Sequence, residues 1–484
     1  MMNRATTGGR SRAIERPPRA APACVNNPPL FGAGDIPRWR AEQLARSDFR
    51  VARVTSGALR SWVVTGTRIS HASGGFFSLV GAEIRSDGAG AKTRYQPFID
   101  QPEVGLLGFI LRRTEDDVFV LVQAKTEPGN PGGVQLAPTF QCTRSNYLMR
   151  HGGARAPFLE YFRGRTSLRG VSSTLQSEQG TRFLNKYNRN VVVEMAAGQE
   201  LALSDRHAAW RWIAMRDLGA LLAQPGTVNT DARSVLASTD WGTLAGRRRP
   251  FQGSAPTSAF AVLLRRSYEE QPEAAQLAST RAWLRDWRRR ARTRVRLRPL
   301  DGIPGWTMSD EGIVPDAAGE VEVRYYSVRA LDREVPHWTQ PLMSSRSRGL
   351  VALICQEREG VLRFLVRASP EPGFGNRVQL SPTIQASSES PALPPEDRDL
   401  LSIVRQRGPG AADIVVDTVL SEEGGRFFRD ENRYEIAHVE PGAVLPETAW
   451  HRWLGLAELR RWISVSGALN NEMRSALSLL LAYL

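Results

Sequence analysis

The chain has 484 residues, of which 41% are hydrophobic and 24% charged, and its net charge is +14. This length exceeds what one hydrophobic core usually holds, so we expect two or three domains of a soluble protein. No run approaches the roughly 18 apolar residues of a membrane span, and the N-terminus lacks a signal-peptide core. Cys24, Cys142 and Cys355 lie far apart, which argues against a disulfide framework or a cysteine-bound zinc ion and favours the cytoplasm.

The positive charge is concentrated in a few segments. Residues 1–40 hold seven arginines against two acidic residues, residues 247–249 are all arginine, and residues 281–298 hold nine arginines against Asp286. The rest of the chain is close to neutral. A nucleic-acid-binding domain would instead show a basic face with aromatic side chains that stack on bases, so we expect no nucleic-acid partner.

The chain repeats itself with an offset of 244 residues. Glu127-Pro128-Gly129 recurs as Glu371-Pro372-Gly373, residues 134–141 recur as 378–385, and residues 177–183 recur as 421–427. One offset that holds over more than 120 residues indicates a tandem duplication.

Four segments follow from this repeat. Residues 1–44 form a basic, Pro-rich tail that we expect to be disordered, and residues 45–242 form the first repeat. Residues 243–292 are a linker, with a loop at Arg247–Thr257 and a connecting helix at Pro272–Arg292. Residues 293–484 form the second repeat.

Each repeat is predicted to hold the same elements in the same order. Apolar runs at 106–111 and 118–122 predict a hairpin, which recurs at 350–355 and 362–366. A strand is expected at 134–141, and a closing helix at 210–222 in the first repeat and at 450–462 in the second. This pattern predicts an α+β fold with two mixed sheets flanked by helices.

The motifs that both repeats keep have two interpretations. Proline and glycine fix turns and tryptophan fills cores, which would make the shared motifs structural. Gln135 and Gln141, held on one strand, are costly to bury unless they bond something, which favours a small-molecule pocket.

The differences between the repeats are chemically more specific. Lys125 becomes Ser369, Glu103 becomes Ser347, and Gln123 becomes Arg367, while Thr143-Arg-Ser-Asn-Tyr147 becomes Ser387-Ser-Glu-Ser-Pro391. All three lysines of the chain lie in the first repeat, and a lysine can lose its proton near neutral pH. These differences indicate either a catalytic site in the first repeat or simple drift between two copies.

Several kinds of site are absent from the sequence. It has no GxGxxG after a strand, no Walker loop, and no HxH or HxxxH pair, so we expect neither a dinucleotide cofactor nor a metal ion. No GxSxG motif supports a serine nucleophile.

Four strings resemble the sugar-nucleotide 2,3-dehydratases of deoxysugar (antibiotic) biosynthesis: residues 71–77 (HASGGFF), 101–105 (QPEVG), 123–130 (QAKTEPGN) and 134–147 (VQLAPTFQCTRSNY). The resemblance covers about residues 45–484. It implies two tandem Nudix-like domains, a homodimer and two nucleotide-sugar pockets in each subunit. Neither repeat carries a Nudix box, so metal-assisted hydrolysis is not implied.

The resemblance also implies a reaction that needs no cofactor. The substrate would be dTDP-4-keto-6-deoxy-D-glucose, whose C4 ketone acidifies the C3 hydrogen. Removing that proton gives an enolate that expels the C2 hydroxyl, and the resulting enol becomes a 3,4-diketo-2,6-dideoxy sugar. A separate 3-ketoreductase would act next. The site must supply a base, a donor for the C4 oxyanion and an acid.

We expect the first repeat to hold the catalytic pocket and the second a vestigial nucleotide-sugar pocket. Lys125 is expected to stabilise the C4 oxyanion, and Tyr147 to transfer the proton, with Glu103 and Lys125 as alternative bases. Trp62 could stack on thymine or fill the core, and Arg182 could serve either pocket or brace a loop. The expected substrate-binding residues are Trp62, Gln123, Thr143, Arg144, Ser145, Asn146, Tyr147 and Arg182, and those of the second pocket are Trp306, Gln385, Ser387 and Ser388.

Two other functions remain open from the sequence. A Nudix-type hydrolase would need acidic metal ligands that the sequence does not show. A non-catalytic protein that binds nucleotide sugars would need only the pockets.

Overall fold

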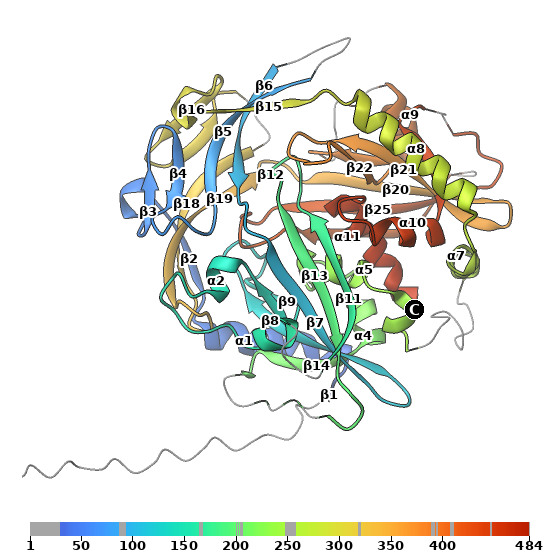
Figure 1. Cartoon of the computed structure of the whole chain (residues 1–484), viewed down its shortest axis with the longest axis horizontal. Helices are drawn as coiled ribbons and strands as arrows, with labels where there is room; N and C mark the ends of the chain where they lie inside the picture. The colour runs from blue at the N-terminus through green and yellow to red at the C-terminus, as the bar shows by residue number, and fades with distance from the viewer. Residues whose placement is uncertain are drawn as a thin grey trace, which may run out of the picture.

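The computed structural model describes residues 30–86, 93–163, 168–199, 201, 203, 207–246, 258–317, 321–388, 393, 395–406, 411–445 and 448–483. Over these residues the chain forms two large mixed sheets and two smaller, mainly antiparallel ones, with helices packed between and around them (Figure 1). The predicted α+β class and the internal duplication are confirmed. No helix among the described residues is long and apolar enough to cross a membrane.

The large sheet of the first repeat contains the predicted hairpin. Its strands follow the order β1-β14-β8-β7-β13-β11, with β9 beside β8 and β10 beside β7. The bounds are β1 Leu30–Phe31, β7 Gly105–Arg113, β8 Val118–Thr126, β9 Val134–Ala137, β10 Phe140–Cys142, β11 Arg169–Ser177, β13 Tyr187–Glu194 and β14 Trp210–Ala214. Strand β8 is buried at almost every position and β7 through its middle, because helices cover the sheet, and so both form continuous apolar runs in the sequence.

The large sheet of the second repeat copies this order, with β26-β21-β20-β25-β24 in place of β14-β8-β7-β13-β11. Its strands are β20 Gly349–Arg358, β21 Val361–Pro370, β22 Val378–Ser381, β23 Ile384–Ala386, β24 Asp413–Ser421, β25 Glu431–Val439 and β26 His451–Gly455. Even a β-bulge recurs at the equivalent position, at Gly170/Ser172 in β11 and at Ile414/Val416 in β24. Such an irregularity is retained within a family, so it supports the duplication independently of the sequence.

The two smaller sheets exchange their first strands. In one sheet, β15 (Arg294–Arg298) of the second repeat pairs with β5, and in the other, β2 (Arg50–Val54) of the first repeat pairs with β18. Figure 1 shows β15 lying with the blue strands and β2 lying with the tan ones. The remaining strands are β3 Trp62–Val64, β4 Arg68–His71, β5 Ser78–Arg85, β6 Thr93–Asp100 and β12 Phe183–Leu184, and β16 Trp306–Ser309, β17 Gly312–Pro315, β18 Val321–Arg329 and β19 His337–Ser345.

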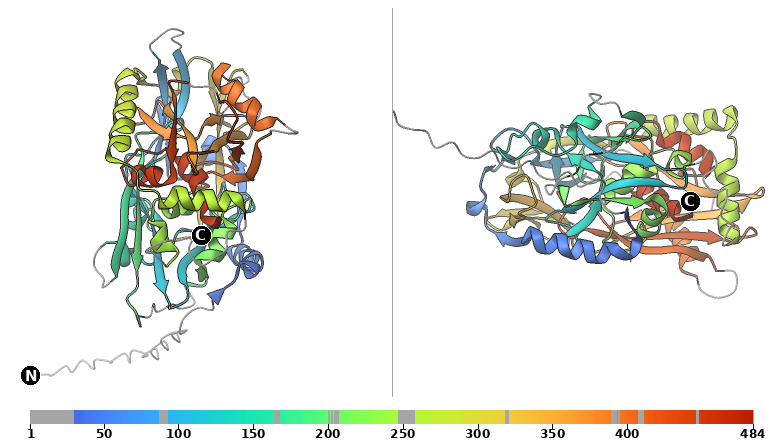
Figure 2. Two further views of the ribbon diagram at one scale, coloured as in Figure 1. Left: turned by 90° about the vertical axis from the view of Figure 1, so that its right-hand side faces the viewer. Right: turned by 90° about the horizontal axis from the view of Figure 1, so that it is seen from below.

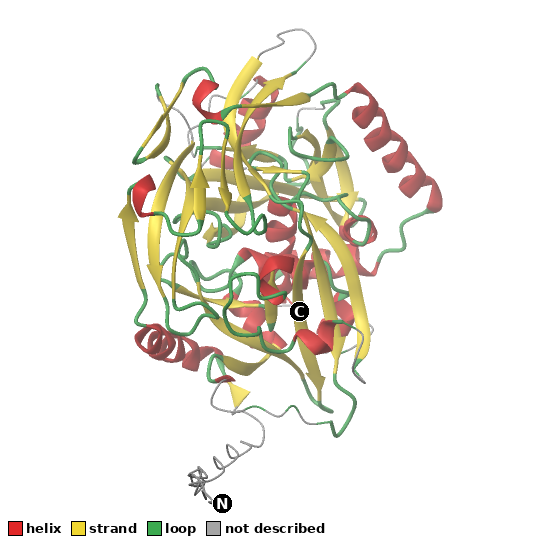
Figure 3. Ribbon diagram, turned by 60° about the vertical axis from the view of Figure 1, so that its left-hand side comes forward, coloured by secondary structure: helices red, strands yellow, loops and turns green. Residues whose placement is uncertain are grey.

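One hydrophobic core joins the two repeats. Helices α5 (Thr230–Ala237) and α11 (Asn471–Leu479) pack against each other, and the buried cluster around them runs from Val122 in β8 to Val366 in β21. The other helices are α1 Ile36–Ser47, α2 Arg144–Tyr147, α3 Leu159–Phe162, α4 Met215–Leu221, α6 Trp241–Leu244, α7 Ala259–Glu269, α8 Ala274–Arg290, α9 Pro395–Arg405 and α10 Leu456–Ile463. Short 3-10 helices lie at Ala33–Asp35, Ser56–Ala58, Leu300–Gly302 and Leu480–Tyr483. Figures 2 and 3 show α8 along the outer side of the molecule.

Three expectations about local structure need comment. The connecting helix is present as α8, but the loop predicted at Arg247–Thr257 lies outside the described residues. Part of the expected tail is folded, because α1 buries Ile36 and Trp39, and Arg40 donates to Val134 O and Gly226 O at 2.7 and 2.6 Å. The expected closing helices each begin with a strand of the large sheet: β14 lies between β8 and β1, and β26 pairs with β21.

Candidate active site

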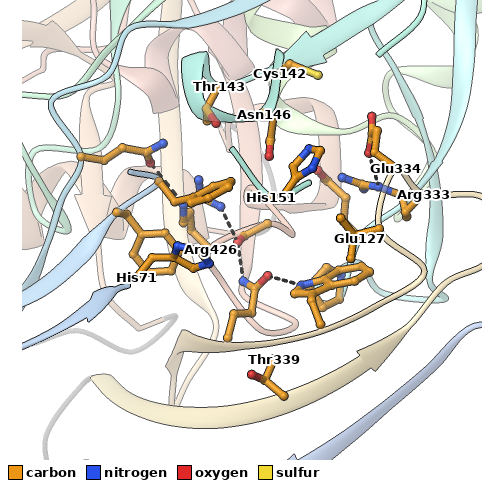
Figure 4. Close-up of a pocket in the computed structure, with 18 of the residues that line it drawn as sticks. His71, Glu127, Cys142, Thr143, Asn146, His151, Arg333, Glu334, Thr339 and Arg426 are labelled. Carbon is orange, nitrogen blue, oxygen red and sulfur yellow. Dashed lines mark hydrogen bonds and ion pairs between the residues drawn. The ribbon is translucent and has the colours of Figure 1, made fainter. Parts of the chain in front are cut away.

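A cavity of about 650 Å³ opens where the two repeats meet (Figure 4). This volume is typical of sites that bind small molecules. The first repeat contributes Trp62, His71, Phe76, Phe77, Gln101, Lys125, Glu127, Gln141, Thr143, Asn146, His151, Lys186 and Asp231, among others. The second repeat contributes Arg333, Glu334, Trp338, Thr339, Gln340, Glu423, Gly425 and Arg426, among others. The cavity therefore belongs to both repeats, whereas the sequence had placed it in the first alone.

Reciprocal turns bring the second repeat to the cavity. The Glu-Pro-Gly turn of each repeat bonds the Glu-x-Gly loop of the other: Gly129 N donates to Gly424 O at 2.8 Å, and Gly373 N donates to Gly180 O at 2.7 Å. A β-carbon on either turn glycine would collide with the backbone of the opposite loop. Glycine is therefore required at both turns, and each loop is held against the partner repeat.

The equivalent arginines of these loops consequently serve opposite repeats. Arg426 of the second repeat lines the cavity, where its Nε donates to Gln101 Oε1 at 3.1 Å and its guanidinium lies 4.4 Å from the centre of the Phe77 ring. Arg182 of the first repeat instead reaches Ser345 Oγ of the second repeat at 3.4 Å. Each arginine contacts the opposite repeat because the repeats exchange these segments. The sequence of a single repeat does not reveal this arrangement.

Lys125 and Glu127 form an ion pair at the end of β8. Lys125 Nζ lies 3.4 Å from Glu127 Oε1 and donates to Gln141 O at 3.0 Å, while Gln141 Nε2 donates to Glu127 Oε1 at 3.1 Å. Both charged side chains are less than 10% exposed. Glu127 Oε2 is buried and has no hydrogen-bond partner in the part of the chain that the structure describes. One carboxyl oxygen is thus anchored, and the other is uncommitted among the residues that the structure describes.

Further carboxyl groups surround this pair. Burial raises the pKa of Asp231 well above its usual range, and the nearby Glu423 and Glu178 raise it further. Burial also raises the pKa of Glu423 to about 7, against the opposing effect of Arg426. Burial lowers the pKa of Lys186 to about 8, although Glu178 opposes this. The cavity therefore holds groups that exchange protons near neutral pH.

His151 is a cavity residue that the sequence pattern did not reveal. Its Nδ1 accepts from Gly153 N at 2.8 Å, so the neutral ring carries its proton on Nε2. Nε2 is buried and finds no partner among the described residues. Burial and the nearby Arg333 lower the pKa of His151, and Glu334 opposes them, which keeps the ring neutral near pH 7. The only sequence signal for His151 as a cavity residue is its position four residues after Tyr147.

Four of the predicted site residues line the cavity: Trp62, Lys125, Thr143 and Asn146. Trp62 forms part of the wall, with its Nε1 donating to Thr339 O at 2.6 Å. Thr143 precedes α2, and its Oγ1 is buried with no partner within the described ranges.

The other predicted residues of the first repeat do not line the cavity. Tyr147 packs against an apolar cluster that contains Phe140 and Leu159. Glu103 accepts from Ser145 N at 2.8 Å and from the Ser145 hydroxyl, which makes these two residues braces of the loop before α2.

Arg144, Gln123 and Arg182 also lie away from the cavity wall. Arg144 is exposed at the start of α2. Gln123 lies within the large sheet, paired in register with Ala137 of β9 and Trp210 of β14. Arg182 faces the second repeat, as described above. Gln123 lies on a strand and Arg144 on a helix, where positions near a site in sequence can face different sides of the element. Arg182 instead reaches the second repeat because the two repeats exchange these loops.

Two of the residues expected in the second pocket, Trp306 and Gln385, keep the bonds of their first-repeat equivalents, whereas Ser387 does not. Trp306 Nε1 donates to Tyr95 O at 2.7 Å, and Gln385 Oε1 accepts from Asn470 Nδ2 at 2.7 Å. Ser387 O accepts from Ser347 Oγ at 3.0 Å, and Ser388 follows it. Glu389, Ser390 and Pro391 lie outside the described residues.

The fold and the cavity define a protein of two repeats whose described residues enclose, where the repeats meet, a cavity of small-molecule size lined by groups that titrate near neutral pH. The family model for NDP-hexose 2,3-dehydratase matches residues 33–239 and 277–480. The chain therefore belongs to the NDP-hexose 2,3-dehydratase family.

Curated relatives carry a consistent name. A dTDP-4-dehydro-6-deoxy-alpha-D-glucopyranose 2,3-dehydratase of Saccharopolyspora spinosa is 32% identical over 90% of this chain and 89% of its own length. Relatives with the same name from Amycolatopsis orientalis and Streptomyces violaceoruber are 32% and 31% identical, over 92% and 91% of this chain and 89% and 95% of their own lengths. A crystal structure of an ADP compounds hydrolase matches 34% of this chain and 86% of its own, with 12% identity and a TM-score of 0.23, and supports no conclusion. The Nudix-like label thus rests on the sequence resemblance.

Proposed function

We propose that the protein is a 2,3-dehydratase of dTDP-4-keto-6-deoxy-D-glucose and works in deoxysugar biosynthesis. The observation that carries the proposal is the cavity itself: Lys125, Glu127 and His151 meet there in a chain whose relatives over nine-tenths of its length are named for this reaction. The reaction needs a base, an oxyanion donor and an acid, and these three side chains supply the first two.

Glu127 is the proposed base for the C3 proton, in place of Tyr147 and Glu103. Its Oε2 is uncommitted, whereas Glu103 is occupied by Ser145 and Tyr147 lies in an apolar cluster. Lys125, 3.4 Å from Glu127 Oε1, is the cation proposed to stabilise the developing C4 oxyanion, together with the Nε2–H of His151.

The context of the reaction is proposed on the same grounds. The dicarbonyl product requires a reductase that acts at C3. The second repeat is proposed to retain a vestigial nucleotide-sugar pocket around Trp306 and Gln385, and the protein to form a homodimer. Buried, unpaired Cys142 and Cys355 fit a reducing cytoplasm.

One experiment separates this function from its rivals. The protein is incubated with the keto sugar nucleotide, and the products are followed by NMR with and without a chelator. Loss of the C2 hydroxyl at the same rate in both samples supports the dehydratase. Chelator-sensitive release of a nucleotide would support a hydrolase, and an unchanged substrate that still binds would support a binding protein.

Substitution of Lys125 tests the assignment of groups. Lys125→Met keeps the stem of the side chain but removes the charge, and it should lower kcat by on the order of 100-fold or more. The matched control is Ser369→Ala at the equivalent position of the second repeat, which should leave kcat within about threefold. Equal rates in the two variants would contradict the assignment.

A further inference from the structure

Glu423 enters the cavity from the second repeat and has no role in the chemistry assigned so far. It lines the wall with Gly425 and Arg426, on the loop that the Gly129 turn holds against the first repeat. Because each repeat supplies this loop to the other, the cavity lacks this carboxyl group unless the second repeat is present.

The distances place Glu423 beside the proposed base. A β-carbon built on Gly425 would lie 2.9 Å from Glu423 Oε1 and 3.6 Å from Glu127 Oε1. The two carboxyl oxygens are therefore no more than about 6.5 Å apart, and both face the α-carbon of Gly425, which places no side chain between them. A sugar ring spans such a gap, so neighbouring carbons of one ring can face the two carboxyl groups.

The equivalent loop of the first repeat has lost both features. Glu423 corresponds to Gln179, and Gly425 corresponds to Thr181. An amide cannot donate and recover a proton as a carboxylic acid does, and a threonine fills the space that the glycine leaves. Of the two equivalent loops, only that of the second repeat, which lines the cavity, combines a carboxylic acid with a glycine two residues later.

We propose that Glu423 is the catalytic acid of this cavity and protonates the departing C2 hydroxyl. This inference rests on the proposed dehydratase function. Glu127 takes the C3 proton, and the C3–H electrons form the C3=C4 enolate. The enolate then returns its electrons to form C2=C3 and restore the C4 ketone, while the C2–O bond breaks and its oxygen leaves as water with the proton from Glu423. In the final tautomerisation C2 gains a proton from Glu127 and the C3 hydroxyl returns one to Glu423, so both groups are reset.

The surroundings of Glu423 suit an acid that works near neutral pH. Burial raises its pKa to about 7, and Glu178 and Glu127 add to the increase. Arg426 and Lys186 limit the shift, so the group can be both protonated and deprotonated within one turnover. The rate should consequently fall as the pH rises above about 7, since only the protonated form donates.

The test compares Glu423→Gln with its mirror control Gln179→Ala. Glu423→Gln keeps the size and should lower kcat by about 100-fold or more while thymidine diphosphate affinity, measured by calorimetry, changes less than about threefold. Its residual rate should also lose the decline above pH 7. Gln179→Ala should match the wild type, and Glu423→Asp should recover part of the rate.

A substrate analogue distinguishes an acid from a merely structural residue. In the 2-deoxy-2-fluoro keto sugar nucleotide the leaving group is fluoride, which departs without a proton. Glu423→Gln should release fluoride at nearly the wild-type rate, whereas Glu127→Gln should not. The inference is overturned if Glu423→Gln keeps wild-type kcat on the natural substrate, or if the fluoro analogue does not restore its rate. A wild type that turns over neither substrate would instead refute the proposed function.

Discussion

The turn glycines that join the repeats allow a paired test of the crossed architecture. In Gly373→Ala, the new β-carbon would lie 2.7 Å from Gly180 O and closer still to Phe183 O, so the turn or the opposite loop must move. The movement breaks the bond from Gly373 N to Gly180 O and the bond from Asn185 N to Gly373 O, both 2.7 Å. Gly129→Ala makes the equivalent change at the loop that carries Glu423 and Arg426.

The expected loss of stability can be worked from these contacts. Two hydrogen bonds contribute about 1 kcal/mol each, and overpacking costs about 1–3 kcal/mol, so each variant should lose about 3–5 kcal/mol of unfolding free energy. For a protein of this size that loss corresponds to a decrease in Tm of several degrees. Gly170→Ala is the matched control, because a β-carbon there meets nothing within 4 Å.

Urea unfolding and turnover, measured together, complete the test. Gly129→Ala and Gly373→Ala should be destabilised alike, but only Gly129→Ala should lose most of its kcat, because it displaces the loop that enters the cavity. Wild-type stability in both variants would refute the reciprocal turns. Equal loss of kcat in both variants would refute the inference that only the loop held by the Gly129 turn enters the cavity.

Three further predictions follow. Arg426→Met should weaken thymidine diphosphate binding at least tenfold in calorimetry, because a charge-assisted contact is lost. The equivalent Arg182→Met should leave the affinity of the cavity unchanged. A larger loss of affinity in Arg182→Met than in Arg426→Met would contradict the assignment of these arginines to opposite repeats. His151→Phe should lower kcat by about 100-fold with nucleotide affinity retained, and an unchanged kcat would exclude its Nε2–H as an oxyanion donor. Burial raises the pKa of Glu472 to about 8, so the folded state binds this proton more tightly than the unfolded chain does. The unfolding free energy should therefore fall as pH rises from 5 to 8. Urea unfolding of Glu472→Gln should show a smaller fall, and a fall equal to that of the wild type would contradict this reasoning.

The sequence by itself was enough to establish the duplication and the main strands. Three signals carried this prediction: the offset of 244 residues, the apolar runs of the hairpins and the Glu-Pro-Gly turns. All three are local or repetitive patterns, which can be recognised without knowledge of the tertiary structure. The contrast between Lys125 and Ser369 pointed to a residue that does line the cavity. Thr139, which the second repeat keeps as Thr383, proved structural, since its hydroxyl accepts from Ile110 N and donates to Leu121 O.

Only the tertiary structure decided which residues share the cavity. Tyr147 and Glu103 lie near cavity-lining residues in the sequence, but Tyr147 packs against an apolar cluster and Glu103 bonds Ser145. The direction of a side chain depends on its packing, which the sequence does not show. Glu423 and Arg426 lie about 300 residues from Lys125, yet they reach the same cavity. The physical reason is the exchange of strands and turns between the repeats: two copies with the same local signals could pair within themselves or across, and only the packed core and the reciprocal backbone bonds select the crossed arrangement.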